Sequence, residues 1–195
     1  MTYVSMGGFP KGSLVVERAG DAFDRINHFF GLLGQVGGAA SLDYNEDAAS
    51  AQRTPIEECL REIQETISNV SMHLPEGFAG GLNRQFANLL DDDAWEEEDE
   101  LITPTALRSF ILLLIVTSTK RRPGIGTNGE GSITASWSNG ENRLVVECLS
   151  CGKISAILAR RMGNDEMERA AFGPMQTERL PHIIAPFSPE VWFDG

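Results

Sequence analysis

The sequence predicts an α+β fold, in which helices pack on a small antiparallel β-meander that is followed by an extended C-terminal tail. Two Thr-Pro pairs, at 54–55 and 103–104, each precede apolar residues at helical spacing. Three later apolar segments are separated by turn residues, which is typical of short strands. Helices and strands that occur in separate runs favour this class over alternating α/β folds.

The first of these helices is predicted over residues 54–73. Thr54 can cap the helix, Pro55 suits the first helical position, and Glu57 completes a capping box. An apolar stripe follows at helical spacing, and Pro75 comes soon after the expected end.

The second helix is predicted over residues 104–120. Its centre, Phe110 to Val116, is apolar on almost every side, so we expect it to be buried. A membrane span needs about 20 apolar residues, which this run does not reach. The basic run 120–122 at its end suits the negative end of the helix dipole.

Three strands are predicted at 132–137, 143–149 and 154–159. The first two are joined by Asn139-Gly140, because Asn-Gly suits the positive φ angles of a type I′ hairpin turn. We expect the two helices to cover one face of this sheet.

The chain therefore divides into three predicted regions. Residues 1–50 form an N-terminal helical region and linker, and residues 51–160 form the α+β core. Residues 161–195 contain scattered prolines and late aromatic residues, and are predicted to be an extended tail that folds back on the body or onto a partner.

Charge is concentrated in one segment of the 195-residue chain. There are 28 acidic and 16 basic residues, and Asp91 to Glu100 holds eight of the acids. A chain this acidic should not bind nucleic acid directly, since replacing phosphate counterions requires Lys and Arg. The run has three interpretations: a solvated loop that aids solubility, a docking surface for a basic partner, or mimicry of nucleic acid. The close bunching of its acids argues against mimicry.

Docking on a basic partner predicts a set of binding residues. Trp95 would be the desolvated anchor, because Trp is enriched at binding hot spots. In the tail, aromatic residues are further candidates, although they could equally pack on their own domain. The predicted partner-binding residues are Asp91, Asp92, Asp93, Trp95, Glu96, Glu97, Glu98, Asp99, Glu100, Phe187, Trp192 and Phe193.

No motif predicts catalysis or a cofactor. Cys148 and Cys151 resemble half of a zinc knuckle, but a structural zinc site needs four ligands. The other candidate ligands are not paired at ligand spacing: Cys59, His28, His73 and His182. The glycine-rich segment 124–129 follows a helix and precedes a strand, the reverse of a phosphate-binding loop. We therefore expect no metal, no cofactor and no enzymatic activity.

The middle of the chain resembles a type of small bacterial protein encoded in mobile or defence regions. The matching pieces are Trp95 with its acids, the Ile102-Thr103-Pro104 helix start, Pro123, Gly131-Ser132-Ile133, Trp137, and the segment 143–147. The resemblance covers residues 90–158, and it implies an antitoxin-like or partner-binding role without catalytic residues. Glu96-Glu97-Glu98 departs from the pattern, because a glycine-containing turn is usual there.

These observations favour a non-enzymatic bacterial protein that binds and regulates or neutralises a partner, as an antitoxin or immunity protein does. The expected partner is a basic protein, such as a nucleic-acid-binding enzyme or a toxin. Two alternatives stay open: an inhibitor that mimics nucleic acid, as in phage anti-defence proteins, and a metal-binding or enzymatic subunit using Cys148 and Cys151. The N-terminus lacks the pattern of a signal peptide, so a cytoplasmic location is expected.

Overall fold

The computed structural model describes residues 54–91, 95, 99–163 and 166–194. Within these residues the predicted α+β class is confirmed. The predicted N-terminal helical region at 1–50 lies outside them. The helices are α2 (Pro55–Val70), η1 (Ser71–His73), α3 (Phe78–Leu89), α4 (Pro104–Thr117), η3 (Thr177–Arg179), α5 (Leu180–Ile184), η4 (Ala185–Phe187) and α6 (Glu190–Phe193).

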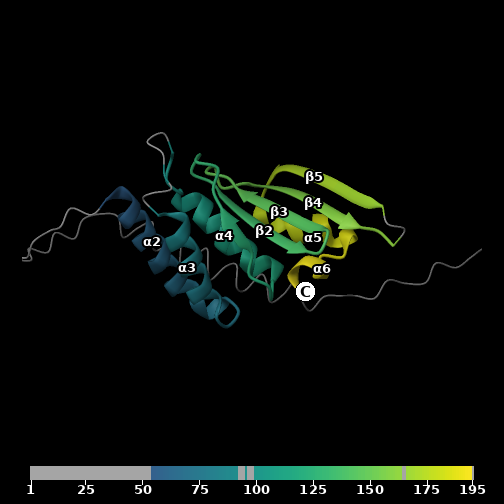
Figure 1. Cartoon of the computed structure of the whole chain (residues 1–195), viewed down its shortest axis with the longest axis horizontal. Coiled ribbons are helices and arrows are strands. Elements are labelled where there is room, and N and C mark those ends of the chain that lie inside the picture. The colour runs from purple at the N-terminus through teal and green to yellow at the C-terminus, as the bar shows by residue number, and fades with distance from the viewer. Residues whose placement is uncertain (1–53, 92–94, 96–98, 164–165, 195) are drawn as a thin grey trace, which may run out of the picture. The chain divides into compact units, whose positions relative to one another are not determined.

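The strands of the described region form one antiparallel sheet in the order β1-β2-β3-β4-β5 (Figure 1). The predicted meander is β2, β3 and β4, and it is extended by one strand at each side. The bounds are β1 (Gly124–Gly126), β2 (Ile133–Asn139), β3 (Asn142–Cys148), β4 (Ile154–Arg161) and β5 (Met167–Met175).

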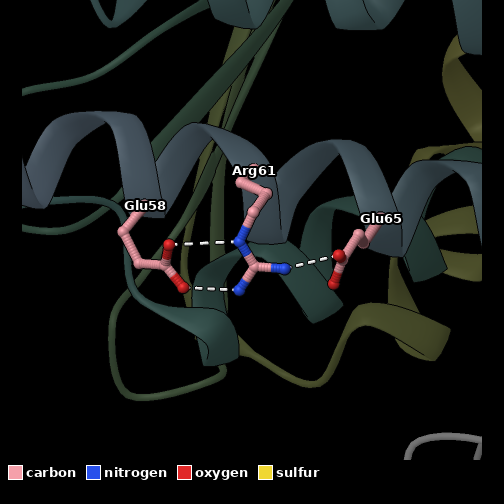
Figure 2. Close-up of polar contacts among 3 residues, drawn as sticks. All are labelled: Glu58, Arg61 and Glu65. Carbon is pink, nitrogen blue, oxygen red and sulfur yellow. Dashed lines mark hydrogen bonds and ion pairs between the residues drawn. The ribbon is translucent and has the colours of Figure 1, made fainter. Parts of the chain in front are cut away.

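Helix α2 begins as the sequence predicts. The Thr54 hydroxyl accepts from the Glu57 backbone N–H, and the Glu57 carboxylate accepts from the Thr54 backbone N–H. On the exposed surface of α2, Arg61 donates to both Glu58 and Glu65 (Figure 2). These hydrogen bonds raise the pKa of the Arg61 guanidinium above its ordinary value. The two carboxylates are thus compensated within the helix itself.

Helix α4 ends at Thr117, three residues earlier than predicted. Ser118 adopts a left-handed conformation with φ 48°, which stops the helix. The backbone N–H groups of Lys120 and Arg121 then donate to the carbonyl of Phe193, each at 3.0 Å. The basic run 120–122 therefore does not lie in the last helical turn, and instead holds the C-terminal end of the chain.

One face of the sheet carries the core. On β2, β3 and β4 every second residue points into it and is buried, as with Trp137, Leu144 and Leu158. Helices α4 and α6 both contact β2 and β3, whereas α2 packs on α3. Helix α4 and the C-terminal segment therefore cover this inner face together. Of the two helices predicted to cover it, α4 does so, whereas α2 packs on α3.

The predicted extended tail at 161–195 is wrong for residues 167–193. Strand β5 pairs with β4, and the short helices that follow supply Leu180, Ile184 and Trp192 to the core. The physical reason is that the inner face of a sheet wider than three strands needs more apolar cover than α4 alone provides. The sequence left two possibilities for this segment, folding back on the body or onto a partner, and in the structure it packs on the body.

Candidate interaction surface

The acidic run 91–100 connects the end of α3 to the start of α4. Its described members, Asp91, Asp99 and Glu100, are exposed, while Trp95 is half-buried. Residues 92–94 and 96–98, which include the predicted binding residues Asp92, Asp93, Glu96, Glu97 and Glu98, lie outside the described residues.

Trp95 is attached to the end of α3. Its indole Nε1–H donates to the carbonyl of Leu89 at 3.0 Å. The last carbonyls of a helix lack partners within the helix, so this bond satisfies one of them. Trp95 is thereby fixed to the body, and the exposed part of its half-buried ring is left to contact a partner.

The end of the run is attached to the loop between β1 and β2. The Glu100 backbone N–H donates to the Gly129 carbonyl at 2.8 Å, and Glu100 forms an isolated β-bridge with Glu130. The carboxylate of Asp99 lies so close to Gly129 that a Cβ there would be 2.3 Å from its oxygen. Gly129 also has φ +75°, so both space and backbone conformation favour glycine here.

The same loop extends the acidic surface onto the sheet. The side-chain amide of Asn128 donates to Glu130 at 3.3 Å and to Glu147 of β3 at 3.0 Å. An amide between two carboxylates keeps them together while adding no positive charge. We call Asp99, Glu100, Glu130 and Glu147 the acidic end of the sheet.

Sequence reasoning missed Glu130, Asn128 and Glu147 as part of this surface. Residues of the run and of the acidic end are up to 56 positions apart, counting from Asp91 to Glu147. The available clue was the position of Glu147, two residues from Val145 and thus on the same outward face of a predicted strand.

Two of the three tail aromatics are buried in the core. Trp192 is 0% exposed and Phe193 is 6% exposed, and the ring of Phe193 contacts Trp137 edge to face at 5.2 Å. Their prediction as partner-binding residues is wrong, because the sheet needs their apolar area for its own core. Phe187 is half-buried and contacts Phe172 of β5 at 6.1 Å.

The cysteines are separated by burial. Cys148 points into the core from β3, and burial raises the pKa of its thiol to about 12. Cys151 is exposed on the following turn, and both thiols are free. Cys59 is half-buried and donates weakly to the Ile102 carbonyl at 3.8 Å; burial raises its pKa as well.

Potential metal ligands are not gathered in the part of the chain that the structure describes. Among those residues, no group of three or more His, Cys, Asp and Glu side chains could hold a metal ion. A thiol with a pKa near that of Cys148 stays protonated at neutral pH, whereas metal binding needs the thiolate. The described geometry thus brings no further ligand to Cys148 and Cys151.

Comparison with known proteins yields no relative: no protein-family model, no curated protein and no solved structure matches this chain. Helices in the described residues are also too short or too polar to cross a membrane.

Proposed function

We propose that this chain is a non-enzymatic bacterial protein of the cytoplasm that binds a basic partner protein through its acidic run and the acidic end of the sheet. The partner would be a nucleic-acid-binding enzyme or a toxin, which the chain would regulate or neutralise in the manner of an antitoxin or immunity protein.

One observation carries the proposal: the acidic run is attached to the folded body at its middle and at its end. Trp95 donates to Leu89, and Glu100 donates to Gly129. A loop that serves only solubility needs no such attachments. Residues 95 and 100, which are held in place, lose less conformational entropy on binding, which favours a docking role.

The acidic end supports the same conclusion, since it adds Glu130 and Glu147 to the carboxylates of the run. Concentrated negative charge steers a basic partner and raises the association rate, and this effect weakens as salt is added.

The test is affinity capture from the native host with the tagged full chain, at low and at high salt, followed by mass spectrometry. We expect a stoichiometric basic protein that is lost at high salt. It should also be lost when the eight acids of 91–100 are replaced by their amides.

A matched pair of variants separates the surface from the net charge. Asp91→Asn with Glu100→Gln removes two exposed acids of the run, and Glu76→Gln with Glu190→Gln removes two exposed acids elsewhere. Only the first pair should weaken capture. Equal weakening by both pairs, or capture that survives the eight amides, would refute docking through this surface.

A further inference from the structure

Within the described residues, the side chains on the outward face of the sheet are exposed or half-buried, and we call this face the open face. A row across its middle is apolar apart from Ser136 at one end. Cross-strand pairing places Ser136 opposite Val145, Val145 opposite Ile157, and Ile157 opposite Ala171. Ile157 is 62% exposed, which is unusual for a large apolar side chain in the middle of a sheet. The inner face, where α4 and α6 pack, is the other side of these strands.

Charge of opposite sign lies on either side of this row. Glu147, two residues after Val145 on β3, faces outward beside Thr134 and Ser155. Arg143, two residues before Val145, also faces outward. It pairs with Ala159 of β4, which in turn pairs with Arg169 of β5. Exposed Lys153 precedes β4 at the first of these ends, and at the second Arg161 pairs with Glu141 at 2.9 Å. By net charge the open face therefore has an acidic end, an apolar middle and a basic end.

We infer that this open face binds a second copy of the same chain, face to face, in a twofold-symmetric dimer. A twofold axis that runs across the strands at the level of Val145 reverses the strand direction of the copy. It therefore places Arg143 of one chain over Glu147 of the other, and the reverse, while Val145 and Ile157 meet their own counterparts. An axis along the strands would place like charges together, so charge alone selects the first arrangement.

The size of the face is sufficient for a weak dimer. Four strands about 4.8 Å apart, each about seven residues of 3.4 Å, give about 460 Å² per copy. The total of about 900 Å² is slightly below the lower limit of about 1,000 Å² for a stable interface, so we expect a weak dimer whose dissociation constant responds to salt and to single substitutions.

The outer edge of the sheet is a poorer place for a second copy. Strand β5 contains Gly173 and Pro174 close to its end, and Pro lacks the N–H that a further strand would use. Charged Arg169 on this strand also discourages edge pairing.

Sedimentation velocity of the full chain over a dilution series, at low and high salt, tests the inference. We expect a monomer–dimer equilibrium that shifts toward monomer in high salt. Ile157→Arg should raise the dissociation constant about a hundredfold or more, since two guanidinium groups would face each other in a desolvated interface. Met72→Arg is the matched control, because Met72 is another exposed large apolar residue, 83% exposed and outside the sheet, and should leave the constant unchanged.

A charge exchange identifies the axis. Arg143→Glu and Glu147→Arg should each weaken the dimer about tenfold or more, and the double variant should restore it, because the pair is then re-formed with exchanged signs. Circular dichroism and thermal unfolding verify that each variant is folded.

Three results would overturn the inference. The first is a wild-type chain that stays monomeric at every concentration. The second is a dimer that survives Ile157→Arg, which would place the contact elsewhere, for example at the edge of β5. The third is a double variant no better than either single variant, which would mean that Arg143 and Glu147 do not pair across the interface. None of these three results contradicts partner binding through the acidic run, which is tested separately by affinity capture.

Discussion

Alkylation of the thiols under native conditions is predicted to separate Cys148 from Cys151. At pH 8 a thiol with the ordinary pKa of 9.0 is about one-tenth thiolate, whereas a pKa of about 12 leaves about one part in ten thousand. Because the thiolate is the reactive form, Cys148 should react at least about a thousandfold more slowly than an ordinary thiol. Its complete burial slows it further.

The assay is iodoacetamide treatment of the folded chain followed by peptide mass spectrometry. Cys151, which is exposed, should be modified first and Cys148 last. Cys151→Ser should remove the fast phase, and denaturant should make all three thiols reactive. Native rates of Cys148 and Cys151 within tenfold of each other would refute the buried position of Cys148 on the inner face.

The same thiol predicts a loss of stability in alkali. The folded-state pKa of Cys148 is raised above that of an unfolded thiol, so its contribution is fully present below pH 9 and is lost as the pH rises toward about 12. The slope is about 1.4 kcal/mol per pH unit in this window. Urea unfolding from pH 8 to 11 measures it, and Cys148→Ala should reduce the slope by that amount.

Four further substitutions test the fold. Thr54→Ala should lower the free energy of unfolding by about 1 kcal/mol in urea titration, because the capping bond to Glu57 is lost. Gly80→Ala should raise it by about 0.5–1 kcal/mol, since the added methyl meets nothing closer than 3.9 Å, whereas Gly77→Ala at φ +76° should lower it by about 1 kcal/mol. Trp137→Phe should cost about 1–3 kcal/mol, because the Arg121 carbonyl loses its 2.9 Å hydrogen bond; no change in thermal unfolding would contradict that contact.

Features with local causes could be predicted from the sequence. The capping box at Thr54 involves residues three positions apart, and the Asn139-Gly140 turn needs only its own backbone angles. The alternation of β2 and β3 likewise follows from one buried face. For these elements, residues close together in the sequence are sufficient to predict the local structure.

Strand β5 could not be predicted because its inward residues do not read as an apolar alternation. They are Glu168, Ala170, Phe172 and, after a register shift, Met175; Glu168 forms an ion pair with Arg160 of β4 at 2.9 Å. Gly173 and Pro174 then resemble a loop, although an edge strand tolerates proline. Pairing with β4 defines the strand, and that pairing is a tertiary contact.

The acidic end and the basic end of the sheet act as separate surfaces. Arg143 and Glu147 are four residues apart on one strand, which is about 14 Å. This exceeds the screening length of about 8 Å at physiological ionic strength, so neither end neutralises the other.

Both proposed interactions use Glu147, which has a consequence for their energetics. A copy that places Arg143 over Glu147 covers part of the acidic end that the basic partner would contact. Two ligands that compete for one surface must each weaken the other by the same factor. If both proposals hold, lowering the concentration of this chain favours the monomer, so it should raise the apparent affinity for the partner. Ile157→Arg should also raise that affinity, because it weakens the dimer although residue 157 does not contact the partner.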